Sequence, residues 1–504
     1  MTVRLSELVE RFGGACTPDP AAGPDPPVLD VHLDSRRVEP GSLFAALPGT
    51  STDGARYAAQ ALAAGAVAVL SPAPLDDRFG RRAGGANWIH PAARRVTGEA
   101  AAMVHGFPAR AMSVVGVTGT NGKSTVAAFA GQLLERAGRR PALFGTIETR
   151  PWGAPSRPAT HTTPDAGELQ RLCKESEGGG GDCVVLEVSS HALDQERIAG
   201  LPLDVAVFTN LGRDHLDYHR DLEAYAAAKE RIFAHLRPGG TAVINAGDPA
   251  APRMVRAAER ASAPVITYGT GPRAGLGAFD VGARPQGTHL FLEGMGIPRT
   301  GLFLPLIGRH NVENALAALA AVLSLGASPS RVLEGLATIS PPPGRLEPVD
   351  VGSRGFRVFV DYAHTPDALE RVLGALRDVL ALEGEEVRGR LIAVFGCGGN
   401  RDREKRAPMG QIVGRLADLA VVTSDNPRDE DPRAIIDDVL VGLGSARAEV
   451  LVEEDRRTAI RRALRIARQG DAILVAGKGH ETWQQWAGRR EPFEDRRVIR
   501  EELP

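Results

Sequence analysis

Short apolar runs alternate with amphipathic stretches along the chain from about residue 110. The runs of the first series lie at 113–117, 183–188, 204–210 and 241–245. They are rich in β-branched residues and have the length of buried parallel strands. After a glycine-rich stretch at 119–122, apolar side chains recur with helical spacing from Val126 to Leu134, and Gly138 closes the helix like a C-cap. This pattern predicts the strand, loop and helix of a doubly wound sheet.

A second series of apolar runs begins near residue 357, and each run ends in a glycine or a polar turn. These runs lie at 357–364, 391–399, 419–427 and 472–480. Open α/β sheets bind ligands at the carboxyl ends of their strands, so these turns are candidate binding loops. A proline-rich segment at 340–345 separates the two series and predicts an interdomain linker, whereas the one at 17–27 predicts a surface loop.

The chain of 504 residues is therefore predicted to hold three α/β domains, at ~100–200 residues per domain. We place the boundaries near 108 and 343. The predicted domains are an N-terminal α/β domain at 1–108, a central doubly wound domain at 109–342 and a Rossmann-like C-terminal domain at 343–504.

Composition excludes several classes of protein. The 60 basic and 62 acidic residues leave a formal charge of −2, and no apolar run approaches the ~18 residues of a membrane span. The N-terminal residues lack a signal-peptide pattern, and the four cysteines are far apart. These cysteines are Cys16, Cys173, Cys183 and Cys397. We expect a cytoplasmic monomer with reduced thiols that binds neither nucleic acid nor membrane.

Lysine is rare in this chain. Only five of the 60 basic residues are lysines, namely Lys123, Lys174, Lys229, Lys405 and Lys478. If arginine has replaced lysine at every position that needs only a positive charge, then each lysine that remains is a candidate functional residue. The alternative is a solvated surface cation.

The segment GVTGTNGKST at 116–125 follows a predicted strand and precedes the amphipathic helix. Its glycines let backbone N–H groups turn toward an anion, and the helix N-terminus adds partial positive charge. Lys123 is expected to reach the β- and γ-phosphates of ATP, and the Ser124 hydroxyl is a candidate Mg²⁺ ligand. Gly116 lies one residue too early for the strict phosphate-loop spacing. The predicted ATP-binding residues are Gly119, Thr120, Asn121, Gly122, Lys123, Ser124 and Thr125.

Two further polar residues are predicted at the same sheet edge. Glu187 lies at the end of the run at 183–188, and His215 follows the next run. A carboxylate and an imidazole beside the phosphate loop predict, together with Ser124, a site for Mg²⁺.

GTNGKST in this context resembles the Mur ligase family, whose members form amide bonds with ATP. The resemblance implies that Glu187 and His215 bind Mg²⁺, and that Lys229 in YAAAKERIF carries a carbamate derived from CO₂. It implies further nucleotide contacts from the segments 307–318, 343–349 and 360–367. The residues concerned are Asn311, Arg345, Asp361 and His364.

The chemistry that the resemblance implies is acyl activation. A substrate carboxylate attacks the γ-phosphate of ATP, and an amine then attacks the resulting acyl phosphate to give an amide, ADP and phosphate. Lys123 and Mg²⁺ neutralise charge on the transferring phosphoryl group, so no side-chain nucleophile is needed.

The segment at 33–54 resembles the uridine-nucleotide domain of family members that add the third peptide residue or a dipeptide. The segments HTTPD at 161–165 and EVSSHALDQER at 187–197 resemble those that hold a UDP-muramoyl dipeptide. The implied contacts are Leu33, Ser35, Thr50, Ser51, Thr52, Thr162, Thr163, Ser189, Gln195 and Arg197.

The motifs DNPR at 425–428 and GKGHE at 477–481 resemble the acceptor site of members that add meso-diaminopimelate. A guanidinium at Arg428 suits the distal carboxylate of this amino acid, and Glu481 suits its ammonium. L-Lysine has the ammonium alone. Asn400 stands where an aspartate is common in the family. The implied residues are Arg401, Asp425, Asn426, Pro427, Arg428, Gly477 and Glu481.

Two alternatives stay open at this point. The chain could be the lysine-adding version of the same enzyme, from which Arg428 distinguishes it. It could also be a phosphate-loop module that binds ATP without ligating, against which the joint presence of Lys123, Glu187, His215 and Lys229 argues.

Overall fold

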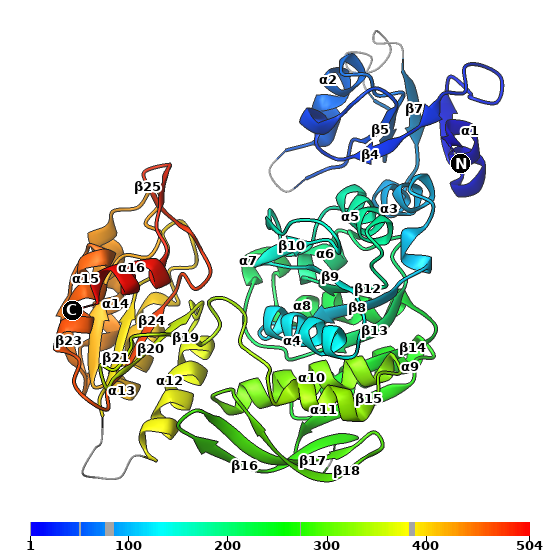
Figure 1. Cartoon of the computed structure of the whole chain (residues 1–504). Coiled ribbons are helices and arrows are strands. Elements are labelled where there is room, and N and C mark those ends of the chain that lie inside the picture. The colour runs from blue at the N-terminus through cyan, green and yellow to red at the C-terminus, as the bar shows by residue number, and fades with distance from the viewer. Residues whose placement is uncertain (1, 50–51, 76–84, 273, 383–388, 504) are drawn as a thin grey trace. The chain divides into compact units, whose positions relative to one another are not determined.

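The computed structural model describes residues 2–49, 52–75, 85–272, 274–382 and 389–503 (Figure 1). The chain forms two compact units. The first consists of residues 1–267 and 319–328, and the second of residues 268–318 and 329–504. Both contain parallel strands covered by helices, as the apolar runs predict. The predicted boundaries at 108 and 343 stay predictions.

The N-terminal part of the first unit is built on a sheet in the order β2-β7-β6-β5-β4. Its strands are β2 (Ala15–Thr17), β4 (Asp30–His32), β5 (Ser42–Ala45), β6 (Ala68–Ser71) and β7 (Ala86–Ile89), and β1 (Val3–Arg4) pairs separately with β3 (Pro27–Val28). Its helices are α1 (Leu5–Phe12), η1 (Ser35–Arg37), η2 (Gly54–Tyr57), α2 (Ala58–Ala63) and α3 (Ala93–Val104). β4 to β7 run parallel, and β2 closes one edge antiparallel to β7. Trp88 anchors the core, since its buried indole donates a 2.8 Å hydrogen bond to the carbonyl of Gly13.

The rest of the first unit contains the strands in the order β11-β10-β9-β12-β8-β13-β14. They are β8 (Ser113–Thr118), β9 (Pro141–Phe144), β10 (Glu148–Arg150), β11 (Arg157–Pro158), β12 (Cys183–Glu187), β13 (Leu203–Phe208) and β14 (Leu236–Asn245). The helices are η3 (Pro108–Arg110), α4 (Lys123–Arg136), α5 (Ala166–Gly178), α6 (Ser190–Asp194), α7 (Leu216–His219), α8 (Leu222–Glu230), η4 (Arg231–His235) and α9 (Ala251–Arg260). All four strands predicted in this region are confirmed, although β14 begins earlier than expected.

The central strands position the candidate site. β9, β12, β8, β13 and β14 run parallel, so their carboxyl ends meet at one edge. The helical stripe from Val126 to Leu134 is buried on α4, as its spacing predicts. Gly138, just beyond this helix, has a φ of 81° and donates to the carbonyl of Glu135, which confirms the predicted helix end.

The second unit has an antiparallel ribbon and a six-stranded sheet that is parallel except for one edge strand. The ribbon consists of β16 (Leu276–Arg284), β17 (Gly287–Gly294) and β18 (Ile297–Leu304), and β15 (Val265–Thr270) and α10 (Arg309–Ser324) cross the division between the units. The sheet has the order β19-β20-β24-β21-β22-β23. Its strands are β19 (Glu347–Val349), β20 (Arg357–Asp361), β21 (Leu391–Phe395), β22 (Leu419–Val422), β23 (Glu449–Val452) and β24 (Ala472–Ala476).

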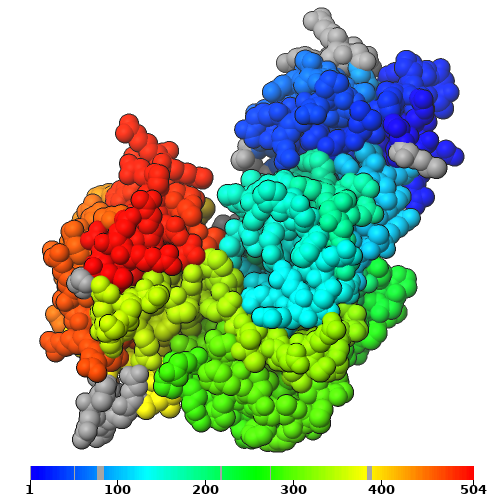
Figure 2. Space-filling view, viewed as in Figure 1, coloured from blue at the N-terminus to red at the C-terminus, as the bar shows by residue number. Residues whose placement is uncertain are grey.

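Helices cover both faces of this sheet. The helices of the second unit are α11 (Pro329–Leu336), α12 (Pro366–Leu380), α13 (Arg406–Leu416), α14 (Pro432–Leu443), α15 (Arg456–Ile466) and α16 (Asp495–Glu502). One core joins α12, α13 and α14 to the sheet, and a second core joins α15 and α16 to its other face. The sheet is therefore doubly wound, as predicted. A hairpin of β25 (Trp483–Trp486) and β26 (Arg489–Pro492) lies at the surface, in orange-red in Figure 2.

Candidate functional site

The phosphate loop joins β8 to α4 at the carboxyl edge of the sheet. Gly119 and Gly122 have φ values of 150° and 87°. A Cβ at position 119 would lie 1.8 Å from Oγ1 of Thr209, so only glycine fits there. Nζ of Lys123 donates hydrogen bonds of 2.9 Å to the carbonyls of Gly119 and Thr120. The ammonium group therefore lies against the loop that is predicted to hold phosphate.

One side chain that follows β13 and one on α8 hold the phosphate loop in shape. The backbone N–H of Asn121 donates a 2.9 Å hydrogen bond to Oδ1 of Asn210, which follows β13. Oγ1 of Thr120 lies 3.2 Å from the hydroxyl of Tyr225 on α8. The sequence motifs alone did not indicate Asn210 or Tyr225. Tyr225 precedes Lys229 by one helical turn, which is the signal that could have found it.

Glu187 lies directly beside the phosphate loop. Its side chain is buried at the end of β12, and its Oε2 accepts a 2.9 Å hydrogen bond from Oγ of Ser124. Thr146, which follows β9, donates to Oε1 from its backbone and to Oε2 from its hydroxyl, at 2.7 and 3.1 Å. The structure thus brings the predicted pair of Ser124 and Glu187 together. The structure also adds Thr146 to this site. Thr146 follows β9, a short strand that the pattern of apolar residues did not predict.

His215 is less enclosed than Glu187. Its side chain is 46% exposed, its φ is 53°, and its Nε2 lies 3.5 Å from Oδ2 of Asp214. Partial desolvation lowers the pKa of His215, and the charges of Lys123 and Lys229 act in the same direction while Asp214 opposes them. A neutral imidazole is the form that binds a metal.

Lys229 lies on α8 and is only 1% exposed. Its Nζ is 4.2 Å from the ring centre of Tyr225. Burial, followed by the charge of Lys123, shifts the pKa of Lys229 well below its usual value, and Asp214 offsets this in part. Among the described residues, no hydrogen bond or ion pair reaches this Nζ. The interior therefore favours a neutral amine.

The donors beside the loop suit Mg²⁺. A hydroxyl at Ser124 and a carboxylate at Glu187 are the hard oxygen ligands that this ion prefers, and substrate phosphates commonly complete its coordination. In the described parts of the chain, no group of three or more His, Cys, Asp or Glu side chains stands ready to hold a metal by itself.

The residues predicted to bind the UDP-peptide fall into two groups, both in the first unit. In the group at 162–197, Oγ1 of Thr163 donates to the carbonyl of Glu187, and Ser189 caps α6 through its hydroxyl. Arg197 donates to the carbonyl of Thr163 at 3.0 Å and to Oε1 of Gln195 at 2.8 Å. Thr162 is linked to Glu187 through Thr146, because its Oγ1 lies 3.0 Å from Oγ1 of Thr146, whose hydroxyl donates to Glu187.

The second group lies in the N-terminal sheet region. Ser35 is buried and donates to Oε1 of Gln60, Leu33 is half-buried, and Thr52 is exposed. No hydrogen bond among the described residues joins these three to the cluster at 162–197. Thr50 and Ser51 lie outside the described residues.

The predicted nucleotide contacts Asn311, Arg345, Asp361 and His364 all belong to the second unit. Both carboxylate oxygens of Asp361 accept backbone hydrogen bonds, from Leu346 and Ala363. Burial raises the pKa of Asp361 to about 6, against the opposing charge of Arg345. The guanidinium of Arg345 lies 4.7 Å above the ring of Tyr362, whose carbonyl contacts the imidazole of His364.

The predicted acceptor residues follow three neighbouring strands of the second unit. Arg401 comes after β21, the segment 425–428 after β22, and Glu481 after β24, in the sheet order β24-β21-β22. Nδ2 of Asn426 donates a 2.8 Å hydrogen bond to Oε2 of Glu481. A Cβ on Gly477 would lie 3.0 Å from Oδ2 of Asp425, so this glycine leaves room for the carboxylate.

Arg428 is held in a strained turn. Its φ is 56°, its Nη1 donates to the carbonyl of Gly399 at 2.6 Å, and its backbone N–H donates to the carbonyl of Gln485 in the hairpin. Partial burial lowers the pKa of Arg428, with the charge of the exposed Arg401 adding to the effect. Asn400 accepts a hydrogen bond from the backbone of Asp429, so it ties the loops after β21 and β22 together.

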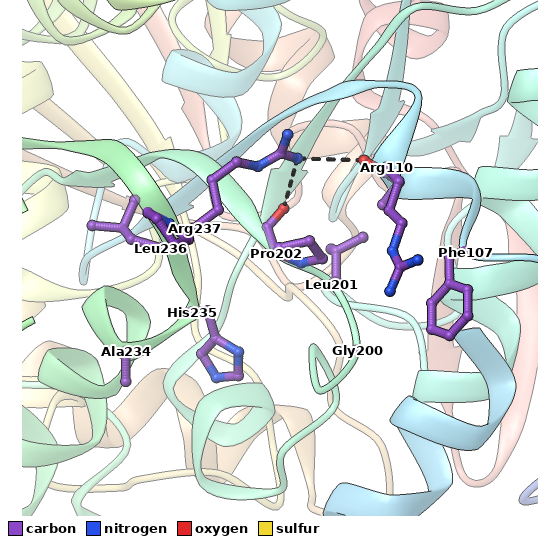
Figure 3. A pocket seen from close by; sticks show the side chains of 11 residues that line it. Phe107, Arg110, Gly200, Leu201, Pro202, Ala234, His235, Leu236 and Arg237 are labelled. Carbon is purple, nitrogen blue, oxygen red and sulfur yellow. Dashed lines mark hydrogen bonds between the residues drawn. The ribbon is translucent and has the colours of Figure 1, made fainter. Parts of the chain in front are cut away.

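A separate pocket of about 380 Å³ lies at the opposite edge of the central sheet (Figure 3). It is lined by residues 107, 109–110, 200–202 and 234–238, which precede or begin β8, β13 and β14. Arg237 is one of the lining residues, and its guanidinium donates hydrogen bonds to the carbonyls of Ala109 and Pro202, which also line the pocket. The pocket is therefore distinct from the phosphate loop.

Within the described ranges, no helix combines the length and the apolar character that crossing a bilayer requires.

Comparisons with known proteins match three segments of the chain to models of Mur ligase domains. Residues 29–101 match the profile described as Mur ligase family, catalytic domain. Residues 117–322 match the Mur ligase middle domain, and residues 344–479 match the Mur ligase, glutamate ligase domain.

Individual relatives extend the similarity to the full length. UDP-N-acetylmuramoyl-L-alanyl-D-glutamate–2,6-diaminopimelate ligase of Gloeobacter violaceus is 42% identical over 506 residues, which cover 99% of this chain and 98% of that protein. A solved structure of a ligase with the same name is 34% identical, with a TM-score of 0.69 over 100% of this chain and 99% of its own. MurF ligase from Thermotoga maritima, solved in complex with ADP, shares the fold at 19% identity, with a TM-score of 0.63 over 94% of this chain and 96% of its own.

Proposed function

The chain belongs to the Mur ligase family, and we propose on that basis that it joins meso-2,6-diaminopimelate to UDP-N-acetylmuramoyl-L-alanyl-D-glutamate. It is an ATP-dependent ligase that forms an amide bond, with the three-domain α/β fold predicted from its sequence. The product is a precursor of peptidoglycan.

One observation carries the choice of acceptor. Asn426 and Glu481 are hydrogen-bonded across two loops, and Arg428 follows in the same turn. The distal end of diaminopimelate has an ammonium and a carboxylate, for which Glu481 and Arg428 offer a carboxylate and a guanidinium. L-Lysine has no distal carboxylate, so Arg428 would face its ammonium as a like charge.

The reaction transfers a phosphoryl group and then an acyl group. A carboxylate oxygen of the D-glutamyl residue attacks the γ-phosphorus of ATP, and the bond to ADP breaks. The amine of diaminopimelate then attacks the acyl carbon, phosphate leaves, and the nitrogen loses a proton. Lys123 contributes a positive charge beside the transferring group, and Mg²⁺, when bound, would supply further neutralisation.

Ser124, Glu187 and His215 are the residues proposed to hold Mg²⁺. The hydrogen bond between Ser124 and Glu187 keeps a hydroxyl and a carboxylate adjacent at the loop. Thr146 fixes the carboxylate from the other side, so its oxygens keep their place when substrate enters.

Lys229 is proposed to carry a carbamate. CO₂ reacts with a neutral amine, and burial lowers the pKa of Lys229, which favours that form. The amine nitrogen attacks the carbon of CO₂, and loss of one proton leaves an anion. In a buried position beside the phosphate loop, this anion would balance the charge of Lys123 and help to hold a cation.

The cluster of Thr162, Thr163, Ser189, Gln195 and Arg197 is proposed to hold the UDP-peptide. Its hydroxyls, amide and guanidinium suit pyrophosphate and carboxylate oxygens. Ser35 and the segment near Thr52 are proposed to contact the uridine end. A cytoplasmic, monomeric enzyme that binds neither nucleic acid nor membrane completes the proposal.

The test is phosphate release by the purified enzyme with ATP, Mg²⁺ and the UDP-dipeptide, with either meso-diaminopimelate or L-lysine as acceptor. We expect product with diaminopimelate and a negligible amount with L-lysine. Efficient use of L-lysine would instead identify the lysine-adding ligase. Phosphate release that needs neither acceptor nor UDP-dipeptide would identify a non-ligating ATPase.

A further inference from the structure

Lys478 is completely buried, although lysine side chains are rarely enclosed without a partner. It follows β24 in the turn that leads to Glu481 and is one of the few lysines in the chain. Its Nζ donates hydrogen bonds to Oδ1 of Asn426 at 3.1 Å and to Oε2 of Glu481 at 3.0 Å. Oδ1 of Asp425 lies 3.9 Å away. The ammonium thus lies at the centre of the proposed acceptor residues.

These contacts determine how Asn426 is oriented. Its Oδ1 accepts hydrogen bonds from Lys478 and from the backbone of Gln485, and its Nδ2 donates to Glu481. The amide cannot turn over without losing all three hydrogen bonds. Lys478 therefore selects the orientation in which Asn426 supports Glu481.

Glu481 is supported at one oxygen only. Its Oε2 accepts from both Lys478 and Asn426, whereas no hydrogen bond from a described residue reaches Oε1. The side chain is 16% exposed, so the carboxylate is anchored but still reachable. One oxygen is thus available for the ammonium of an acceptor.

The charges of the buried and half-buried side chains in the cluster are balanced as well. Asp425 and Glu481 carry negative charge, and Lys478 and Arg428 carry positive charge, while the neighbouring Arg401 is exposed to solvent. A balanced site suits a group that is itself a zwitterion, such as the distal end of diaminopimelate. A lone ammonium would leave the same site with an uncompensated charge.

We propose, on the basis of the proposed function, that Lys478 is a positioning residue that orients Glu481 and selects a zwitterionic acceptor over a lone ammonium. It acts through Asn426 and Glu481 and does not itself contact the acceptor. Replacing Lys478 should affect the acceptor site in two separable ways. The side chain of Glu481 loses its fixed orientation, and the site loses one positive charge.

The test compares Lys478→Met with wild type in the ligation assay, with each substrate varied in turn. We expect KM for diaminopimelate to rise at least about tenfold, because Glu481 loses a charged partner. KM for ATP and for the UDP-dipeptide should change less than about twofold. The ratio of kcat/KM for diaminopimelate to kcat/KM for L-lysine should fall at least about tenfold, since a site with one positive charge fewer repels an ammonium less.

Two further variants separate positioning from simple stability. Lys478→Gln keeps a hydrogen-bond donor without the charge, so KM for diaminopimelate should rise less than in Lys478→Met while the acceptor ratio still falls. Glu481→Gln should raise KM by a smaller factor in the Lys478→Met background than in wild type, because the two residues act as a unit. Ile473→Ala, a buried change on β24, is the control for destabilisation alone and should leave the acceptor ratio unchanged.

Three results would contradict the role proposed for Lys478. Unchanged KM for diaminopimelate in Lys478→Met, a parallel rise of KM for all three substrates, or independent effects of Lys478 and Glu481 would each overturn the inference. If Lys478→Met does not fold, the acceptor ratio of Lys478→Gln decides. A wild-type enzyme that cannot use diaminopimelate would defeat the proposed function itself, whatever these variants show.

Discussion

Ser124 and Glu187 are joined by a hydrogen bond of 2.9 Å from Oγ to Oε2, although 63 residues separate them in the sequence. The bond connects the first turn of α4 with the end of β12, the strand beside β8 in the sheet. A hydroxyl from the phosphate loop and a buried carboxylate are therefore held next to each other. This pair is the structural basis of the proposed Mg-nucleotide site.

Gly145→Ala should disrupt this pair by steric contact. A Cβ on residue 145 would lie 2.2 Å from Oε1 of Glu187, so the carboxylate has to move away from Ser124. We expect ligation to fall at least about tenfold, since a misplacement of about 1 Å can lower a rate about 100-fold. Gly374→Ala on α12 is the matched control, because an added Cβ there meets nothing within 4 Å. Wild-type activity of Gly145→Ala would contradict the assigned role of Glu187.

Lys123→Ala should abolish ligation and leave binding of the UDP-dipeptide nearly intact. The lysine is proposed to face the charge that develops during phosphoryl transfer, and not the nucleotide sugar. Steady-state phosphate release measures the first effect, and calorimetric titration with the UDP-dipeptide measures the second. Near wild-type turnover would remove the assignment of the phosphate loop.

Lys229→Ala should be nearly inactive if the lysine carries a carbamate. Lys229→Glu restores an anion at shorter reach and should recover part of the activity, and added bicarbonate should stimulate the wild type alone. Lys174→Ala is the control, because Lys174 is an exposed cation paired with Glu177 on α5. Full activity of Lys229→Ala would reduce Lys229 to a structural residue.

Lys229→Met should be more stable than wild type at pH 7 in CO₂-free buffer. The folded state lowers the pKa of Lys229, so between the folded pKa and about pH 10.5 the unfolded chain binds up to one proton more than the folded chain. The free energy of unfolding of the wild type therefore rises with pH between the folded pKa and about 10.5. The advantage of the methionine should shrink over that window by up to about 1.4 kcal/mol per pH unit. Denaturant titrations at several pH values measure this difference, and a difference independent of pH would contradict a neutral Lys229.

Arg428→Ala should impair the use of diaminopimelate specifically. Losing one partner of a charged hydrogen bond in a poorly hydrated site costs about 2–5 kcal/mol, and ~1.4 kcal/mol is a factor of ten. We expect kcat/KM for diaminopimelate to fall well over about tenfold, with smaller changes for ATP and the UDP-dipeptide. The exposed Arg433, paired with Asp437 on α14, provides the control Arg433→Ala. Unchanged kinetics for diaminopimelate would exclude Arg428 from the acceptor site.

The phosphate loop shows how far the sequence by itself determines this protein. Residues 119–125 are contiguous, and the strand before them and the helix after them are visible as local patterns. The buried parallel strands and the stripe on α4 are likewise local, because side-chain burial follows the periods of strand and helix. The resemblance of these motifs to a known family was therefore sufficient to predict the fold class and the reaction.

Burial was decided by the tertiary structure. The helix pattern around Lys229 is equally compatible with an exposed cation, but α8 packs so that the amine is enclosed beside Tyr225. In the sequence, nothing distinguished Lys478 from the other four lysines, whereas the fold buries it completely. The residues around a lysine in the sequence do not show what packs against its helix or turn. Its exposure therefore cannot be predicted from the local pattern.

Contacts across the sheets were also decided by the tertiary structure. Thr146 reaches Glu187, and Asn426 reaches Glu481, because β9 lies beside β12 and because the loops after β22 and β24 converge. Strand order depends on how the whole chain is wound, and no local period encodes it. The sequence alone therefore determined which chemical groups the protein has and which elements carry them. The sheet order decided which of those groups touch, because hydrogen bonds form only between groups that the fold brings within about 3 Å.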